Sequence, residues 1–489
     1  MAISTRGWPL RRGLVDSLKE SPLFNAGLVW SAFLVTRLFL LYAQLVLLPT
    51  SGDCDIRIFG HYANSYALAT SHGCSVYDYC DPEYPNLALM VMALPNAFCD
   101  PSDLAAYRGW YRVEMALFDV LAFATAVWLV RRFFGEETRW QRTQRLLAFV
   151  AGGLLLGTLL QTRLDAVVGA LVLLSLALLV SRLHYVWSFA VLAAAVNFKL
   201  VPVVLIPLWV AASLPPALVA SIRDKGGPWR LLAACCGRTA VAGALTVALA
   251  VPAFLASGGR SLGFLSYHRD RGLEIGSFYS SALLLLRPLG YPEQFGFGHG
   301  SINVDAATAP LLARLSPYIT LGLVLLATAI AVRYVLQEKV EGGHRRGNPA
   351  GDLAWAASLV LAAFVVGNKV FSPQYLLWLA PLMPLVRLPA TRYRLALITL
   401  ASACALSTIA VLVWQRQIVG ETEWIETATN VAGPTAWGSG LLIGRNVVFL
   451  GFVLLLGASW PGNRRGLCFA PPGNAVNDFP LILKGEPGA

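Results

Sequence analysis

Two acidic residues follow directly on the first long apolar segment of the chain, in the sequence SGDCDIRIF at 51–59. A carboxylate held beside a hydroxyl group can take its proton as the oxygen attacks, which contributes about 10²- to 10⁴-fold in rate. Asp53 and Asp55 are therefore candidate general bases. Asp78, Glu83 and Tyr84, farther along the same polar stretch, are candidates for contact with a substrate.

Basic residues gather in other parts of the chain, again where apolar segments end. The sequence SYHRDRGLEIGS spans 266–277, and a lysine begins KVFSPQYLLWL after another apolar run. Guanidinium, imidazolium and ammonium groups at the level of lipid headgroups suit a phosphate carried by a lipid. The candidate ligands of this phosphate are His268, Arg269, Arg271, Lys199 and Lys369.

Four more polar groups at segment ends are candidates for contact with a substrate, namely Arg163, Asp165, Glu274 and Gln374. A tight turn between two spans explains Arg163 and Asp165 equally well. Lys199 has an alternative too, because lysines at span ends commonly extend to the membrane interface. Charges drawn to one membrane face are costly unless they line a polar cavity, so the convergence itself predicts a site.

The elements that must position these groups are apolar helices. The chain has 489 residues, of which 56% are hydrophobic and 13% charged, and its mean hydropathy is +0.61. This predicts an all-α polytopic membrane protein, a single integral membrane domain over 1–489 with about 11–13 transmembrane helices. The expected spans are 25–49, 110–130, 147–163, 166–181, 187–198, 200–214, 231–257, 306–336, 352–367, 374–388, 393–414 and 441–459.

The basic residues predict the orientation of these spans. The net charge of +11 is spread over short loops and forms no single patch, which argues against a nucleic-acid partner. If the spans alternate, most basic clusters share one side with the N-terminus, which the positive-inside rule makes cytoplasmic. The long segments 50–109 and 258–305 then lie outside and carry the candidate site, in a plasma membrane.

Two further patterns predict local structure. Arg37 and Asp119 lie near the middle of their spans, and the simplest account is a buried ion pair that holds two helices in register. The short spans 187–198 and 200–214 predict a broken or re-entrant pair of helices around Lys199.

The first outer loop also holds half of the eight cysteines of the chain. Outside the cytoplasm disulfides can persist, so two bridges are expected, with all three connectivities open. The four residues concerned are Cys54, Cys74, Cys80 and Cys99.

Four blocks of sequence together resemble membrane glycosyltransferases of the GT-C superfamily, closest to glycosyltransferase family eighty-seven with its polyprenyl-phosphate-mannose-dependent mannosyltransferases. One departure is Pro85-Asn86, where the family usually has two prolines. The blocks are DIRIFGHYA with VYDYCDPEYPNLAL (55–63 and 76–89), NFKLVPVVLIPL (197–208), YHRDRGLEIGS (267–277) and KVFSPQYLLWLAPL (369–382).

The resemblance implies a GT-C-like helical bundle with its active site on the outer face. It implies transfer of a sugar, mannose first, from a polyprenyl-phosphate donor to a glycolipid or glycan hydroxyl by inversion, with Asp55 as the base. His268 would face the donor phosphate, supported by Arg269, Lys199 and Lys369. A transporter or flippase of lipid-linked sugars is the alternative. No cofactor is expected, and a divalent metal at Asp53 and Asp55 stays open, because no strong ligand set is visible.

Overall fold

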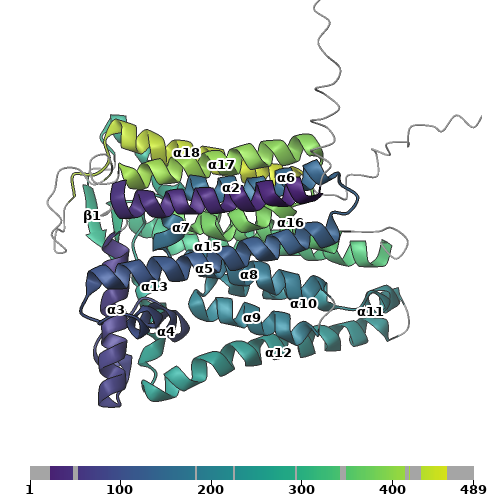
Figure 1. The fold of residues 1–489 in the computed structure, drawn as a ribbon, viewed down its shortest axis with the longest axis horizontal. Coiled ribbons are helices and arrows are strands. Elements are labelled where there is room, and N and C mark those ends of the chain that lie inside the picture. Colours follow the sequence, from purple (N-terminus) through teal and green to yellow (C-terminus); the bar gives the residue numbers. More distant parts are fainter. Residues whose placement is uncertain are drawn as a thin grey trace, which may run out of the picture.

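Long helices that run roughly along one axis make up most of the computed structural model (Figure 1). The model describes residues 22–47, 53–181, 184–223, 226–291, 294–341, 348–413, 418 and 431–459. In this part of the chain six helices are long and apolar enough to cross a membrane. They are α5 (Leu104–Phe133), α12 (Gly227–Ala256), α15 (Ala309–Glu341), α16 (Pro349–Gly367), α17 (Ala390–Leu412) and α18 (Ala436–Ala458).

Shorter apolar helices complete the bundle, so the chain is an all-α polytopic membrane protein in its main architecture. The break predicted at Lys199 is present: α9 ends at Phe198, Lys199 is extended, and a 3₁₀ turn follows. The shorter elements are α2 (Pro22–Tyr42), η1 (Ala43–Leu47), α6 (Arg139–Leu156), α7 (Leu159–Thr162), α8 (Asp165–Val180), α9 (Tyr185–Phe198), η4 (Val201–Leu205), α10 (Ile206–Ser213), α11 (Pro216–Ala220) and η5 (Ser221–Arg223).

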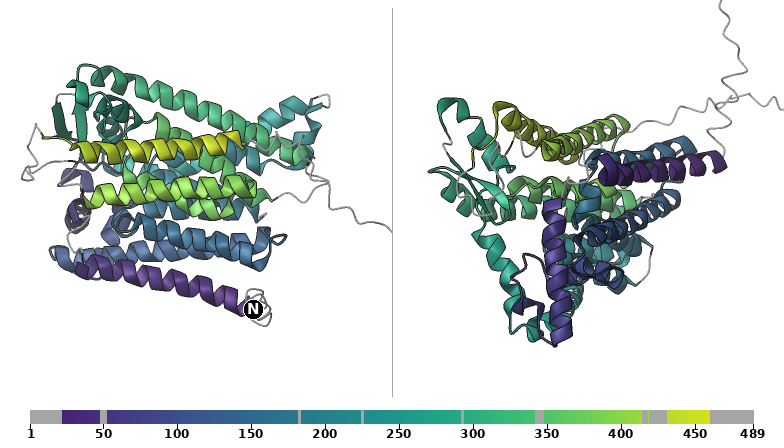
Figure 2. Two further views of the ribbon diagram at one scale, coloured as in Figure 1. Left: turned by 90° about the horizontal axis from the view of Figure 1, so that it is seen from above. Right: turned by 60° about the vertical axis from the view of Figure 1, so that its left-hand side comes forward.

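A second set of elements crosses one end of the bundle. Helix α3 runs almost perpendicular to the long helices, and the hairpin of β1 and β2 lies at the same end (Figures 1 and 2). This set comprises α3 (Asp53–His72), η2 (Val76–Asp78), α4 (Asn86–Ala93), η3 (Leu94–Ala97), η6 (Arg260–Leu262), α13 (Gly263–Asp270), α14 (Phe278–Leu284), η7 (Arg287–Leu289), β1 (Gln294–Gly298) and β2 (Ser301–Asp305).

The core lies around α16, which is buried along nearly its whole length, whereas α12 is mostly exposed. Beside α16 the chain forms two 3₁₀ helices, η8 (Pro373–Trp378) and η9 (Ala380–Leu385). The predicted span 374–388 is therefore wrong as an α-helix. Pro373, Pro381 and Pro384 remove backbone donors and cannot continue an α-helix, so this apolar run folds as buried 3₁₀ turns.

The predicted pair of Arg37 and Asp119 is confirmed, with 2.6 Å between Nε and Oδ2. Arg37 also donates to the carbonyl oxygen of Val150 on α6. Gly153, one turn on, makes room for the guanidinium, because a Cβ there would lie 2.1 Å from Nη2 of Arg37. The pair thus links α2, α5 and α6.

Two other expectations need correction. The antiparallel hairpin β1–β2 was not predicted; it pairs Gln294 with Asp305 and Gly298 with Ser301. The two expected disulfides are wrong, because three of the four cysteines of the segment 50–109 are free thiols. Each thiol lies against a carbonyl oxygen of its own turn, at 3.7 Å for Cys74, 3.6 Å for Cys80 and 3.3 Å for Cys99. The side chain of Cys54 lies outside the described residues.

Candidate functional site

One ion pair joins α3 to the break that follows α7, and a second joins the start of α8 to the break that follows α9. Arg163 binds the Oδ1 atom of Asp55, and Nζ of Lys199 lies 2.8 Å and 3.0 Å from the two carboxylate oxygens of Asp165. The alternative for Lys199, extension to the membrane interface, does not occur, since its side chain is only 14% exposed. Residues of three distant segments therefore meet at the end of the bundle crossed by α3.

The local fold explains why these groups point together. Gly157 has a φ of 53°, a value that favours glycine, and it ends α6 before the single turn of α7. Arg163 is then extended and α8 begins at Asp165. The QTRLD sequence is thus a tight turn, as the simpler alternative proposed, and its two charged side chains nevertheless join the cluster.

Aromatic rings of η8 form one wall of the cluster. Nζ of Lys199 lies 5.2 Å from the ring centre of Tyr375 and 5.5 Å from that of Trp378, within the range of cation–π attraction. These rings keep the ammonium group of Lys199 at the cluster while Asp165 balances its charge.

Glu83 lies between the acidic and basic groups. Its carboxyl group accepts a hydrogen bond from Tyr267, and Arg271, Asp55 and Lys199 are all close enough to act on its charge. Burial raises the pKa of Glu83, although the bond from Tyr267 and the charge of Arg271 oppose this. The acids of the segment 50–109 and the cations of later segments therefore act on one another.

His268, which was predicted to face the donor phosphate, lies near several cations. Burial, together with Lys199, Arg271 and Lys369, lowers its pKa to about 4. The imidazole is therefore neutral at pH 7. It can still donate a hydrogen bond to a phosphate oxygen, but it adds no charge.

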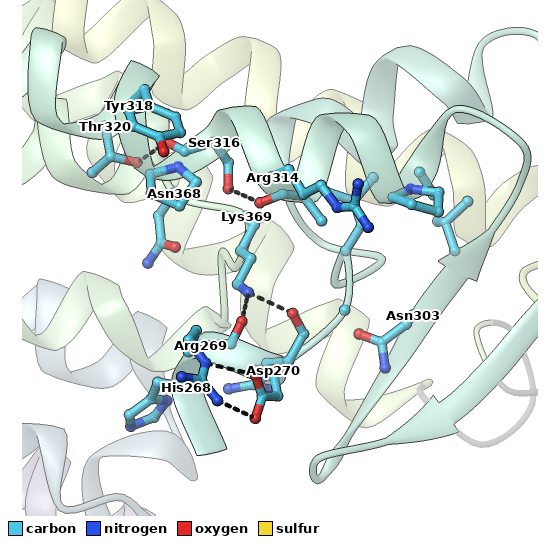
Figure 3. A pocket seen from close by; sticks show the side chains of 18 of the residues that line it. His268, Arg269, Asp270, Asn303, Arg314, Ser316, Tyr318, Thr320, Asn368 and Lys369 are labelled. Carbon is cyan, nitrogen blue, oxygen red and sulfur yellow. Dashed lines mark hydrogen bonds and ion pairs between the residues drawn. The ribbon is translucent and has the colours of Figure 1, made fainter. Parts of the chain in front are cut away.

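Lys369 holds the loop between α13 and the hairpin in place. Its Nζ donates to the carbonyl oxygens of Arg269 at 2.8 Å and of Arg271 at 2.5 Å, as Figure 3 shows. Burial lowers the pKa of Lys369, and the nearby guanidinium of Arg271 adds to this effect. Arg269, in contrast, is 76% exposed and pairs with Asp270 at 2.8 Å. Arg271, which is less exposed than Arg269, is thus the better placed guanidinium.

A cavity of about 1230 Å³ opens beside these cations (Figure 3). Its polar end includes His268, Arg271 and Lys369. The opposite wall belongs to α15, which contributes mainly apolar residues such as Leu321 and Val324, together with Arg314, Ser316 and Thr320. The cavity therefore joins a cationic end to an apolar wall on a membrane-spanning helix.

Helix α15 carries a proline at this wall. Pro317 cannot donate to the carbonyl oxygen of Ala313, but the Oγ atom of Ser316 does so at 3.0 Å. Thr320 in turn donates to the carbonyl oxygen of Ser316 at 2.7 Å. These side chains satisfy the backbone, so α15 keeps a helical course past the cavity.

Several predicted site residues have other partners. Asp78 pairs with Arg260 and accepts from the backbone N–H of Ser75 at 2.9 Å, so it caps a 3₁₀ turn. Arg260 and that bond hold the pKa of Asp78 below its usual range. Glu274 is buried and accepts from the backbone N–H of Phe371 at 2.8 Å.

The remaining predicted site residues are Gln374, Tyr84 and Asp53. Gln374 is also buried, and its Oε1 atom accepts from Ser372 at 2.9 Å. Tyr84 packs edge-on against Phe59 and lies within range of the charges of Asp55 and Asp165. The side chain of Asp53 lies outside the described residues.

The sequence reasoning missed Tyr267, Asn303, Arg314 and Asn368. Tyr267 contacts Glu83, and the other three line the cavity. Tyr267 precedes His268 in the block 267–277, so its position in the sequence could have identified it as a candidate site residue. Arg314 falls inside a predicted span, where a charged residue marks function by default. Asn303 lies in the unexpected hairpin and carried no signal.

Within the described residues no group of three or more His, Cys, Asp or Glu side chains is arranged to hold a metal ion. Comparison of the chain with family models, with curated proteins and with solved structures finds no match. The geometry of the site is therefore the basis for assigning a function.

Proposed function

We propose that this protein is a membrane glycosyltransferase that transfers a sugar, mannose first, from a polyprenyl phosphate to a glycolipid or glycan hydroxyl. The observation that carries the proposal is the cavity that joins a cationic end to an apolar wall. A lipid with a phosphate head needs both surfaces. The carboxylates of Asp55 and Glu83 adjoin the cationic end through Arg271 and Lys199.

The proposed reaction is a single displacement with inversion. The acceptor oxygen attacks the anomeric carbon of the donor while Asp55 takes the hydroxyl proton. The bond from the anomeric carbon to the phosphate oxygen breaks, and its electron pair leaves with polyprenyl phosphate. Arg271 and Lys369 supply positive charge where negative charge grows on the leaving phosphate, and a prearranged environment of this kind is usually a large contribution to catalysis.

The ion pair supports Asp55 as the base. Arg163 binds one carboxylate oxygen and thereby fixes the orientation of the group. Glu83 is a weaker candidate, because Tyr267 already donates to it and burial favours its protonated form. In this proposal Glu83 and Tyr84 contact the sugar or the acceptor.

The proposed placement is a GT-C-like bundle of about a dozen spans in the plasma membrane, with the site outside and the N-terminus in the cytoplasm. The long helices α5 and α15 both begin at the end crossed by α3 and run to the opposite end (Figure 1). Their last turns carry Arg131, Arg132 and Lys339. Basic residues at that opposite end favour its cytoplasmic location.

The test is a panel of labelled polyprenyl-phosphate sugars incubated with purified full-length protein. A transferase releases free polyprenyl phosphate and forms a labelled acceptor product from at least one donor, with the mannose donor expected first. A transporter or flippase would move the donor across a vesicle membrane and leave its covalent structure unchanged. Translocation of intact donor without any polyprenyl phosphate released would refute the proposal.

A further inference from the structure

A second cavity, of about 350 Å³, lies among α2, α5 and α6. It is at the opposite end of the bundle from α3, since α5 runs away from α3 and α6 begins where α5 ends (Figure 1). Ligand pockets commonly have volumes of about 300–1,000 Å³, so this cavity can hold a small polar group. None of the residues assigned to the proposed reaction lines it.

The lining of this cavity divides into a basic side and an apolar side. The basic side consists of Arg131 from α5 and of Arg139 and Arg142 from α6. The apolar side includes Ala26 and Trp30 of α2. No Asp or Glu of the described chain lines the cavity, and the nearby Glu137 is bound to Arg145 at 2.7 Å. Among the described lining residues, Arg131 and Arg142 therefore supply positive charge that no lining carboxylate balances.

The start of α6 adds to this positive charge. A helix N-terminus has partial positive charge and favours acidic residues or bound anions. The first turn of α6 has no acidic residue and begins with Arg139 instead. Arg142 and Thr143 follow on the cavity side. Arg142 therefore adds positive charge at a place where a helix end already favours an anion.

The apolar side identifies the kind of anion. Trp30 packs edge-on against Phe123 with 4.8 Å between ring centres, and aromatic residues of this type prefer the membrane interface. Basic pockets between transmembrane helices bind the headgroups of anionic lipids. We propose that the cavity among α2, α5 and α6 binds the phosphate headgroup of an anionic phospholipid from the adjoining leaflet. The inference does not depend on the proposed transferase activity.

The test compares variants of equal charge in purified full-length protein. Native mass spectrometry measures binding of phosphatidylglycerol, with phosphatidylcholine as the neutral lipid. The variant Arg131→Gln/Arg142→Gln removes charge from the cavity. The matched control Arg132→Gln/Arg394→Gln removes the same charge from exposed positions outside the lining. Each cavity arginine should contribute about fivefold in affinity, so the cavity variant should bind phosphatidylglycerol on the order of 25-fold more weakly.

A third variant, Ala26→Phe, fills the apolar side without any change in charge. It should weaken phosphatidylglycerol binding as well, so the inference stays testable even if the arginine variant does not fold. Wild-type protein should prefer phosphatidylglycerol to phosphatidylcholine, and the control variant should keep that preference. Equal loss in the cavity and control variants, or unchanged binding in Ala26→Phe, would overturn the proposal. Displacement of the lipid by inorganic phosphate at equal concentration would also overturn it, in favour of a free anion site.

Discussion

Two of the acid–guanidinium pairs among the described residues differ in what surrounds them. Arg37 and Asp119 pair between membrane-spanning helices, with side chains 11% and 4% exposed. Arg163 and Asp55 pair at the end of the bundle, with side chains 19% and 24% exposed. In the first pair every guanidinium nitrogen donates to the protein, two to Asp119 and one to Val150. In the second, Nε of Arg163 has no hydrogen-bond partner among the described residues.

This difference distinguishes an ion pair that stabilises the fold from an ion pair that belongs to the candidate site. A buried pair stabilises a fold only if its remaining donors and acceptors are satisfied, and Arg37 meets that condition. Arg163 and Asp55 instead lie in a group of charges that includes Glu83, Lys199 and the cations of the large cavity. A charged group whose hydrogen-bonding capacity is not fully used within the protein can bind a ligand.

The largest effect that the comparison predicts is on turnover. Asp55→Asn removes the proposed base and should lower the rate of sugar transfer by about 10²- to 10⁴-fold, with the melting temperature near that of wild type. The measurement is transfer from labelled donor by purified protein, normalised to folded molecules. Full activity in Asp55→Asn would move the base to Glu83 or to the other predicted acids, Asp53 and Asp78.

The structural pair should show the opposite pattern. Asp119→Leu leaves the charge of Arg37 without its partner and should lower the free energy of unfolding by about 3–5 kcal/mol. Activity per folded molecule should stay near wild type. Thermal unfolding in detergent measures the loss, and the double variant Arg37→Leu/Asp119→Leu should recover most of it. A double variant as unstable as Asp119→Leu would contradict the role of the pair.

A smaller effect should distinguish the two arginines of the segment after α13. Arg271→Gln should raise the donor KM by about 10- to 150-fold, because a hydrogen bond to a charged group contributes about 1.5–3 kcal/mol. Arg269→Gln is the matched control, since Arg269 is exposed and already paired with Asp270. Equal effects of the two substitutions would mean that burial of Arg271 has no part in donor binding.

The smallest expected effect concerns pH. Because the pKa of His268 is lowered to about 4, the imidazole is neutral between pH 5 and 8 and causes no change of rate there. Its contribution to stability is present above the ordinary histidine pKa of about 6.5 and is lost as pH falls towards 4. Rate profiles of wild type and His268→Gln should therefore have the same shape above pH 5. An acid limb near pH 6.5 that disappears in His268→Gln would contradict this.

Much of the fold follows from local physics that a sequence contains. Apolar runs of helical length predicted the bundle, and Arg37 with Asp119 could be paired because an unpaired charge at mid-membrane is costly. The apolar run 374–388 was wrongly predicted as an α-helical span, because its hydropathy does not show that its prolines exclude an α-helix. The two disulfides were wrongly predicted, because the number of cysteines does not determine the distances between their thiols.

The site was predictable in composition but not in detail. Charges at the ends of distant spans implied a common face, and the structure brings Asp55, Arg163, Asp165 and Lys199 together there. Burial of Glu274 and the charge state of His268 depend on tertiary neighbours, which no local pattern contains. The hairpin with Asn303 gave no periodic signal, because strands of five residues are too short.

The most direct test of the proposed site is a structure of the wild-type protein with a non-transferable polyprenyl-phosphate sugar bound. We expect the phosphate within hydrogen-bond distance of Arg271 and Lys369, the isoprenoid chain along α15 and the anomeric carbon facing Asp55. A phosphate bound away from both cations, or a sugar that faces away from Asp55, would contradict it.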